Sequence, residues 1–142
     1  LHDRLLEQVR YDDNSLSQWT LAYADPNNDN PYGPLVNDLG ICYGYASAFQ
    51  LLMQMVGIEC ITVHGTARSD RAEHAWNQVL LDGQWYCVDV TWDDPTTDTP
   101  LSDAEAHRYF NVTSDFLRQT SHQWDAETVP EATATAYAWQ AA

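Results

Sequence analysis

Two stretches in the middle of the chain carry the pattern of paired β-strands. Residues 74–81 and 85–91 are rich in Trp, Tyr, Val and Leu, and they flank the dipeptide Asp82-Gly83, a strong signal for a two-residue hairpin turn. This turn fixes the register, because the last residue of one strand must pair with the first residue of the next. The pattern therefore predicts an antiparallel hairpin in which Leu81 pairs with Gln84.

A helix is predicted directly after a loop rich in turn-forming residues. Residues 25–34 are dense in Pro, Asn, Asp and Gly, and from Cys42 onward apolar or small residues recur at the spacing of one helical face. Gly57 marks the end of this helix. The remaining pattern predicts a further helix over residues 1–10 and strands over 58–66 and 108–112. The predicted fold class is α+β, with helices packed on an antiparallel sheet.

Length and composition predict a single domain over residues 1–142. The chain is long enough for one core and too short for two ordinary domains. Hydrophobic residues make up 44% of it, and no apolar run approaches the roughly 18 residues of a membrane helix. The net charge of −15 argues against nucleic acid or an anionic membrane as a partner, since both require clustered Lys and Arg. A start at Leu1 is expected of a domain excised from a longer protein. The cell surface and the cytoplasm both remain open as compartments, and a bacterial cell-surface or secreted location is favoured.

The hairpin register brings a histidine and a carboxylate together. Counting back from the turn, Trp76 falls opposite Asp89, and His74 falls opposite Thr91. Because side chains alternate between the two faces of a strand, His74 and Asp89 share one face as diagonal neighbours. Such neighbours lie roughly 7–8 Å apart at the backbone, which is within reach of a carboxylate and an imidazole. Asp89 is therefore predicted to orient His74.

Cys42 lies in the first turn of the predicted helix. Unpaired backbone N–H groups and the positive end of the helix dipole favour the thiolate there. A thiol nucleophile needs a neighbouring base, and the base needs a third group that fixes its orientation; Cys42, His74 and Asp89 provide these residue types. Cys60 and Cys87 lie in predicted strands and are interpreted as packing cysteines. The four other histidines belong to no motif and are interpreted as surface or structural residues.

Three segments together resemble a known family. Residues 40–46 read Gly-Ile-Cys-Tyr-Gly-Tyr-Ala, residues 73–77 read Glu-His-Ala-Trp-Asn, and residues 85–95 read Trp-Tyr-Cys-Val-Asp-Val-Thr-Trp-Asp-Asp-Pro. In order and approximate spacing they resemble a bacterial transglutaminase-like domain, a branch of the papain-like thiol enzymes. The resemblance implies a helix that carries the nucleophile Cys42 at its N-terminus, packed on a sheet that carries His74 as general base and acid and Asp89 as its orienting partner.

The resemblance implies a thiol-dependent enzyme that acts on amide bonds of peptide or protein substrates. It would form a thioester on Cys42 and pass the acyl group to water, as a protease or amidase, or to an amine, as a transglutaminase. No metal or organic cofactor is required. A backbone N–H near Cys42 is one candidate oxyanion donor, Tyr32 and Asn37 are candidates for the second, and Trp76 is a candidate for substrate contact.

Two alternatives from other functional classes stay open at this point. A transglutaminase-like domain can serve as a non-catalytic protein-binding module, since fold does not dictate function. Cys42, His74 and Asp89 are also all metal-ligand types, but a fourth ligand is missing and Asp89 is placed to orient His74, which disfavours a metal site.

Overall fold

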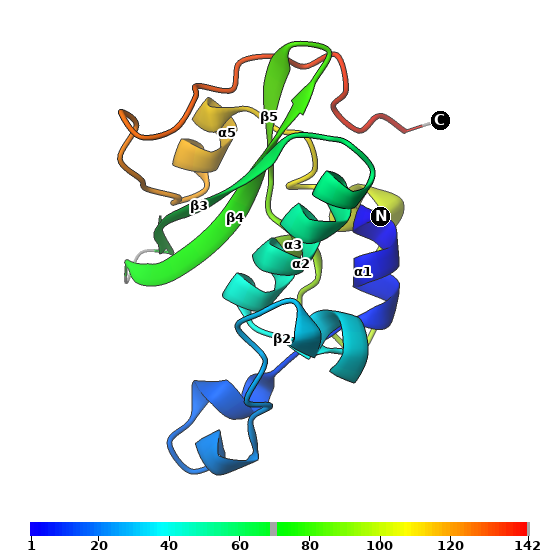
Figure 1. Ribbon diagram of the computed structural model, residues 1–142, viewed down its shortest axis with the longest axis vertical. Coiled ribbons are helices and arrows are strands. Elements are labelled where there is room, and N and C mark those ends of the chain that lie inside the picture. Colours follow the sequence, from blue (N-terminus) through cyan, green and yellow to red (C-terminus); the bar gives the residue numbers. More distant parts are fainter. Residues whose placement is uncertain (69–70, 142) are drawn as a thin grey trace.

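A three-stranded antiparallel sheet forms the centre of the molecule (Figure 1). The computed structural model describes residues 1–68 and 71–141. Its strands β3 (Cys60–Ala67), β4 (Ala72–Leu81) and β5 (Gln84–Val88) lie in the order β3-β4-β5. Leu81 pairs with Gln84, so the predicted register of the hairpin is confirmed.

Two of the sheet predictions were wrong in extent. The strand predicted over 85–91 ends at Val88, because Asp89 caps the short helix α3 (Val90–Asp93) and its side chain accepts a hydrogen bond from the Trp92 N–H. The strand predicted over 108–112 is reduced to a single bridge between Val112 and Cys87. In the described part of the chain, the sheet therefore has three strands instead of four.

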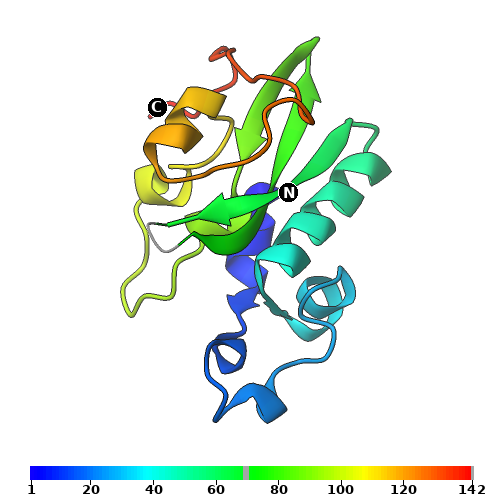
Figure 2. The same cartoon turned by 90° about the vertical axis from the view of Figure 1, so that its left-hand side faces the viewer.

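Helices cover one face of the sheet (Figure 2). Helix α2 (Cys42–Met55) begins at the predicted residue and packs on β3 and β4, whereas α1 (His2–Gln8) ends two residues earlier than predicted. Their shared core contains the following buried residues: Leu5, Val9, Tyr45, Ala48, Phe49, Met53, Cys60, Val79, Tyr86, Val88 and Val90. The α+β prediction is confirmed.

The opposite face of the sheet has a second core. Helix α5 (Ser114–Gln119) contributes Leu117, and the sheet contributes Val63, Trp76 and Cys87. Trp76 belongs to this core and Val79 to the first one, so β4 is covered on both faces. Helix α4 (Asp103–Ala106) lies in the segment that joins α3 to α5.

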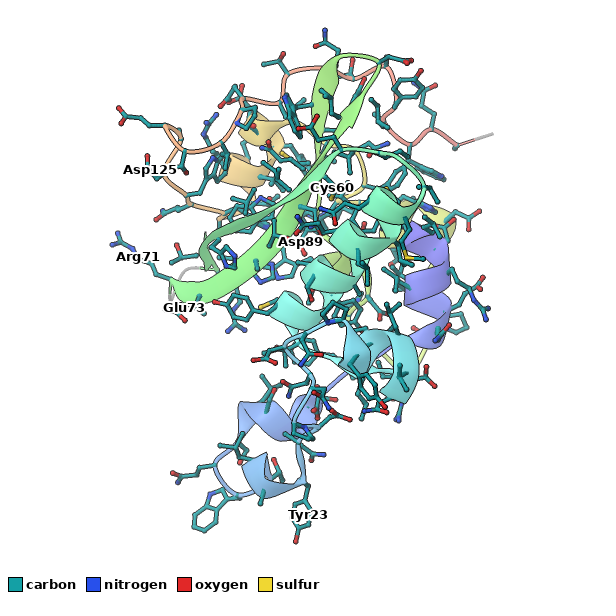
Figure 3. The ribbon with its side chains drawn as sticks, viewed as in Figure 1. Tyr23, Cys60, Arg71, Glu73, Asp89 and Asp125 are labelled. Carbon is teal, nitrogen blue, oxygen red and sulfur yellow. The ribbon has the colours of Figure 1, made fainter. Side chains whose placement is uncertain are left out.

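A long loop precedes α2 and projects from the body of the molecule, with Tyr23 near its far end (Figure 3). Parallel pairing of β1 (Arg10–Tyr11) with β2 (Leu39–Gly40) closes it, and it contains the short helices η1 (Asp13–Leu16), η2 (Leu21–Tyr23) and η3 (Gly33–Asn37). The buried carboxylate of Asp12 accepts hydrogen bonds from the Asp25 N–H at 2.7 Å and the Asn28 side chain at 3.1 Å. None of the helices in the described residues is long and apolar enough to cross a membrane.

Candidate active site

Cys42 is the first residue of α2, and a close backbone contact holds this end of the helix in place. The Ile41 N–H donates to the carbonyl of Asn28, and the Asn28 carbonyl also packs where Gly44 has no side chain. Any larger residue at position 44 would push this loop away from the helix. Cys42 is 7% exposed and lines a cavity of about 240 Å³.

His74 lines the same cavity, and its imidazole is bonded to Asp89. The Nε2–H of His74 donates to Oδ2 of Asp89 at 2.7 Å, as the hairpin register predicted. Asp89 is fully buried, its backbone N–H donates to the Tyr109 carbonyl at 2.9 Å, and its other oxygen caps α3. In Figure 3, Asp89 is labelled within the body of the molecule. A residue held by this many contacts can fix the orientation of the imidazole.

The electrostatics of this pair favour an imidazolium and a carboxylate. Burial by itself lowers the pKa of His74, but the charge and hydrogen bond of Asp89 outweigh it and, with a hydrogen bond to Cys42, raise that pKa to about 9. Burial likewise opposes ionisation of Asp89, yet His74 and the hydrogen bonds lower its pKa to about 2. Since Nε2 of His74 is committed to Asp89, Nδ1 is the nitrogen left for the thiol. The three residues therefore form one connected chain.

His122 is a further partner of Asp89 that the sequence interpretation missed. Its Nε2–H donates to the same Oδ2 of Asp89 at 2.7 Å, and its side chain has no solvent exposure. Thr66 and Gln123 exchange two backbone hydrogen bonds, which bring residue 122 over the sheet. Gly65 allows this approach, because a side chain there would overlap the Gln123 carbonyl. His122 is buried and hydrogen-bonded, as expected of a structural histidine. The sequence interpretation did not predict that its partner is Asp89.

Aromatic rings surround the imidazole, but not in the predicted arrangement. Trp92 lines the cavity, with its ring 5.4 Å from that of His74 and 4.4 Å from that of His122. Trp76 is 1% exposed and does not line the cavity; its ring lies 5.8 Å from His74 and edge-on to Trp124 at 5.7 Å. Trp92 therefore forms part of the cavity wall, while Trp76 packs against the imidazole in the core. Contact between Trp76 and a substrate stays a prediction.

Tyr32 and Asn37, the candidates for an oxyanion donor, lie on the loop before α2. Both are exposed, neither lines the cavity of Cys42, and the Asn37 amide donates to the Asp25 carboxylate at 2.8 Å. Their assignment stays a prediction.

The other two thiols are unlike Cys42 in their surroundings. Burial raises the pKa of Cys60 to about 12, and burial likewise raises that of Cys87 to about 11. Neither lines the cavity. Both are buried in the sheet, as predicted for packing cysteines.

The candidate metal ligands do not include the thiol. Among the described residues, ligand atoms of His74, Asp89 and His122 lie within 4.8 Å of one another, and Cys42 is outside this group. The one Asp89 oxygen that contacts both imidazoles accounts for the cluster by hydrogen bonding alone.

The fold and the site together define the class of protein. A helix that begins at a cysteine packs on an antiparallel sheet, and a hairpin of this sheet positions a histidine that is hydrogen-bonded to an aspartate. The pattern of the transglutaminase-like superfamily matches residues 1–90. The chain belongs to the transglutaminase-like superfamily.

Individual relatives agree with this assignment. Kyphoscoliosis peptidase from Mus musculus is 37% identical over an alignment of 71 positions, and the match covers 43% of this chain and 11% of the mouse protein. The Lim and transglutaminase domain protein ltd-1 from Caenorhabditis elegans is 32% identical over an alignment of 88 positions, and the match covers 51% of this chain and 12% of that protein. The chain thus spans about a tenth of the length of these relatives.

A solved structure supports the fold. The crystal structure of a TGase superimposes with a TM-score of 0.55 and 19% identity, and the match covers 77% of this chain and 29% of that one. At this identity the similarity concerns the fold alone.

Proposed function

We propose that this domain is a thiol-dependent amide-bond enzyme in which Cys42 is the nucleophile, His74 the general acid and base, and Asp89 the residue that orients His74. The observation that carries the proposal is the buried hydrogen bond between His74 and Asp89 at 2.7 Å, together with the presence of Cys42 and His74 in one cavity. The peptidase among the relatives supports the same reaction class.

The proposed reaction begins with a Cys42 thiolate and a His74 imidazolium. The sulfur attacks the carbonyl carbon of the substrate amide, and the oxygen takes up the negative charge. The Cys42 N–H, in the first turn of α2, has no acceptor four residues earlier in the helix and is available to that oxygen. Collapse breaks the C–N bond, the amine leaves with the proton from His74, and a thioester remains on Cys42.

The second half of the reaction returns the enzyme to its starting state. Neutral His74 removes a proton from water or from an amine, which attacks the thioester carbonyl and releases the acyl group. Throughout, the Asp89 carboxylate stabilises the imidazolium and keeps Nε2 occupied, so that Nδ1 carries the proton transfers. Water as acceptor gives hydrolysis, and an amine gives transamidation.

The cavity favours substrates without excess negative charge. Its lining holds the carboxylates of Asp13, Glu73 and Asp94 and the guanidinium of Arg68, and the whole chain carries a net charge of −15. Such a field attracts cationic groups and repels anionic ones. Peptides with basic residues, and free amines as acceptors, are the proposed substrate classes.

The test is an assay that separates the two acceptors. An unfolded protein substrate is incubated with the enzyme, with and without a fluorescent primary amine, and mass spectrometry scores cleaved peptides and incorporated amine. The chain contains no lysine, so no lysine side chain of its own competes with the label as the acceptor amine. Cys42→Ala is expected to abolish both products, and Cys60→Ala, which removes a buried thiol outside the cavity, is the matched control.

Product formation that survives in Cys42→Ala contradicts the proposed nucleophile. If the wild type binds the substrate and forms neither product, the domain acts as a non-catalytic protein-binding module instead.

A further inference from the structure

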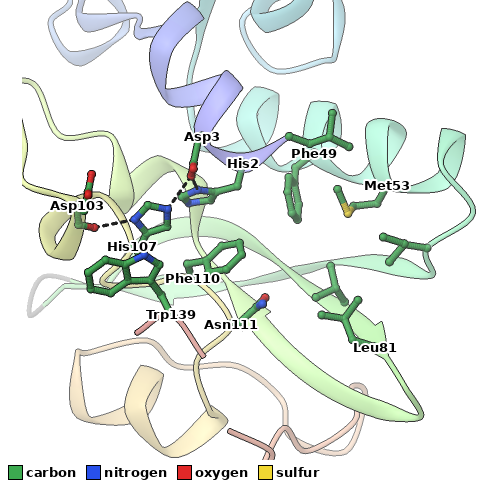
Figure 4. A pocket seen from close by; sticks show the side chains of 13 residues that line it. His2, Asp3, Phe49, Met53, Leu81, Asp103, His107, Phe110, Asn111 and Trp139 are labelled. Atoms are coloured by element: carbon green, nitrogen blue, oxygen red, sulfur yellow. Dashed lines mark hydrogen bonds and ion pairs between the residues drawn. The ribbon is translucent and has the colours of Figure 1, made fainter. Parts of the chain in front are cut away.

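A second group of ligand-type side chains lies apart from the thiol cavity. His2 and Asp3 are the first residues of α1, and His107 follows α4; one ligand atom from each lies within 4.8 Å of the others. All three line a cavity of about 680 Å³ (Figure 4). In the described residues, this cavity shares no lining residue with the cavity of Cys42.

Both histidines point a ring nitrogen at the same carboxylate oxygen. Oδ1 of Asp3 lies 2.8 Å from Nδ1 of His2 and 2.7 Å from Nε2 of His107. Figure 4 shows the two rings next to each other at the Asp3 carboxylate, with their centroids 5.4 Å apart. Each of these contacts is attractive only if something positive, a proton or a metal ion, lies between the nitrogen and the oxygen.

The remaining ring nitrogens already have acceptors of their own. Nε2 of His2 lies 2.8 Å from Oδ2 of the buried Asp93, and Nδ1 of His107 lies 2.7 Å from the Asp103 carbonyl. Carboxylates and carbonyls only accept hydrogen bonds, and a neutral imidazole has a single N–H. In neutral rings these contacts use that N–H, which leaves lone pairs on His2 Nδ1 and His107 Nε2 directed at Asp3.

This arrangement is the one that metal-ligating histidines have. Such a histidine binds the ion through one nitrogen and donates its other N–H to a carboxylate or a backbone carbonyl, which fixes the ring. The ring of His2 is 4% exposed, and the ring of His107 stacks on Trp139 at 5.2 Å with an interplanar angle of 5°. Both rings are therefore held in place before an ion arrives.

We propose that His2 Nδ1, Asp3 Oδ1 and His107 Nε2 form a binding site for a divalent ion of the zinc class. Zn²⁺ takes nitrogen and oxygen ligands at about 2.0–2.2 Å, so tetrahedral ligands are roughly 3.3 Å apart. The present contacts need to widen by about 0.5 Å to reach that spacing. Three protein ligands leave a position for water or for a donor group of a molecule in the 680 Å³ cavity.

The cluster around Asp89 does not carry the same inference. His74 and His122 both face Asp89 through Nε2, but Nδ1 of His122 faces the hydroxyl of Thr120 at 3.4 Å. A hydroxyl can donate as well as accept, so a neutral His122 can place its proton toward Asp89. Hydrogen bonding satisfies that cluster without an ion.

The test is zinc binding to protein without an affinity tag, measured by competition with a chromogenic chelator. One ion per chain is expected for the wild type. Asp3→Asn and His107→Gln change partly exposed side chains. Each is expected to raise the dissociation constant for zinc at least about 100-fold. Loss of a residue that only supports a ligand costs up to about 100-fold in affinity, and loss of a direct ligand is expected to cost at least as much. Two control variants are expected to bind zinc as tightly as the wild type. One is His64→Gln, which changes an exposed histidine outside both clusters, and the other is His74→Ala.

A wild-type chain that binds zinc no more tightly than Asp3→Asn and His107→Gln overturns the proposal, as does loss of the ion in His74→Ala alone. A second measurement needs no variant. In the NMR spectrum of the wild type, zinc is expected to shift the imidazole resonances of His2 and His107 and to leave those of His74 and His122 in place. Shifts confined to His74 and His122 contradict the proposed site.

Discussion

The ion pair between His74 and Asp89 makes a quantitative prediction for the variant Asp89→Asn. The rise in the pKa of His74 from 6.5 to about 9 corresponds to about 3 kcal/mol of preference for the imidazolium in the folded state. Asparagine removes the negative charge, while the burial that lowers the pKa of His74 remains. We expect the pKa of His74 in Asp89→Asn to fall below 6.5.

This change alters the pH dependence of stability. A histidine whose pKa is raised on folding contributes stability that is fully present below pH 6.5 and is lost as the pH rises through about 9. The free energy of unfolding of the wild type, relative to that of Asp89→Asn, is therefore expected to decrease by about 3 kcal/mol between pH 6 and pH 10. Urea denaturation at intervals across this range measures the difference.

Two other effects do not change the pH dependence of this difference. Cys60 and Cys87 titrate at high pH in both proteins, so their contributions cancel in the difference. Asp89→Asn also loses a charged capping group of α3, but that loss is nearly constant in this range, because the pKa of Asp89 is about 2. A difference in stability that does not change with pH refutes the ion pair.

Three further changes test the supports of the site. His122→Leu removes a buried donor to the Asp89 carboxylate and is expected to cost about 1.5–3 kcal/mol of stability in urea denaturation. His122→Gln keeps a side-chain N–H and should cost less. Equal losses in the two variants contradict the role of the donor. Gly65→Ala forces the Gln123 backbone away and is expected to cost about 1–3 kcal/mol, and an unchanged melting temperature would show that the approach is not tight. Tyr45→Phe removes the hydroxyl that donates to Asp94 at 2.6 Å and should lower stability by about 1–3 kcal/mol in chemical denaturation; no loss means that this bond contributes nothing net.

The parts of the site that local sequence rules could predict are those set by one turn and one helix. Asp82-Gly83 determined the register of the hairpin, and the register in turn placed His74 next to Asp89. The start of α2 followed from the change in periodicity at Cys42. These features depend on residues close together in the sequence.

The missed features depend on contacts between distant segments or on competing signals. Residues 89–91 follow an aromatic and β-branched run, and this run led to the prediction that the strand continues to residue 91. In the structure the capping preference of Asp89 ends the strand at Val88. His122 reaches Asp89 from 33 positions along the chain through the pairing of Thr66 with Gln123. No local pattern around His122 indicates that partner.

The proposed chemistry of the site rests on activation of the Cys42 thiol by His74. The rate of alkylation of each cysteine by iodoacetamide, resolved by mass spectrometry as a function of pH, measures it directly in the wild type, in His74→Ala and in the control His64→Ala. We predict that Cys42 reacts far faster than the buried Cys60 and Cys87 below pH 8, and that this advantage falls at least about 10-fold in His74→Ala only. A Cys42 that reacts as slowly as the buried thiols, or equally fast without His74, contradicts the account.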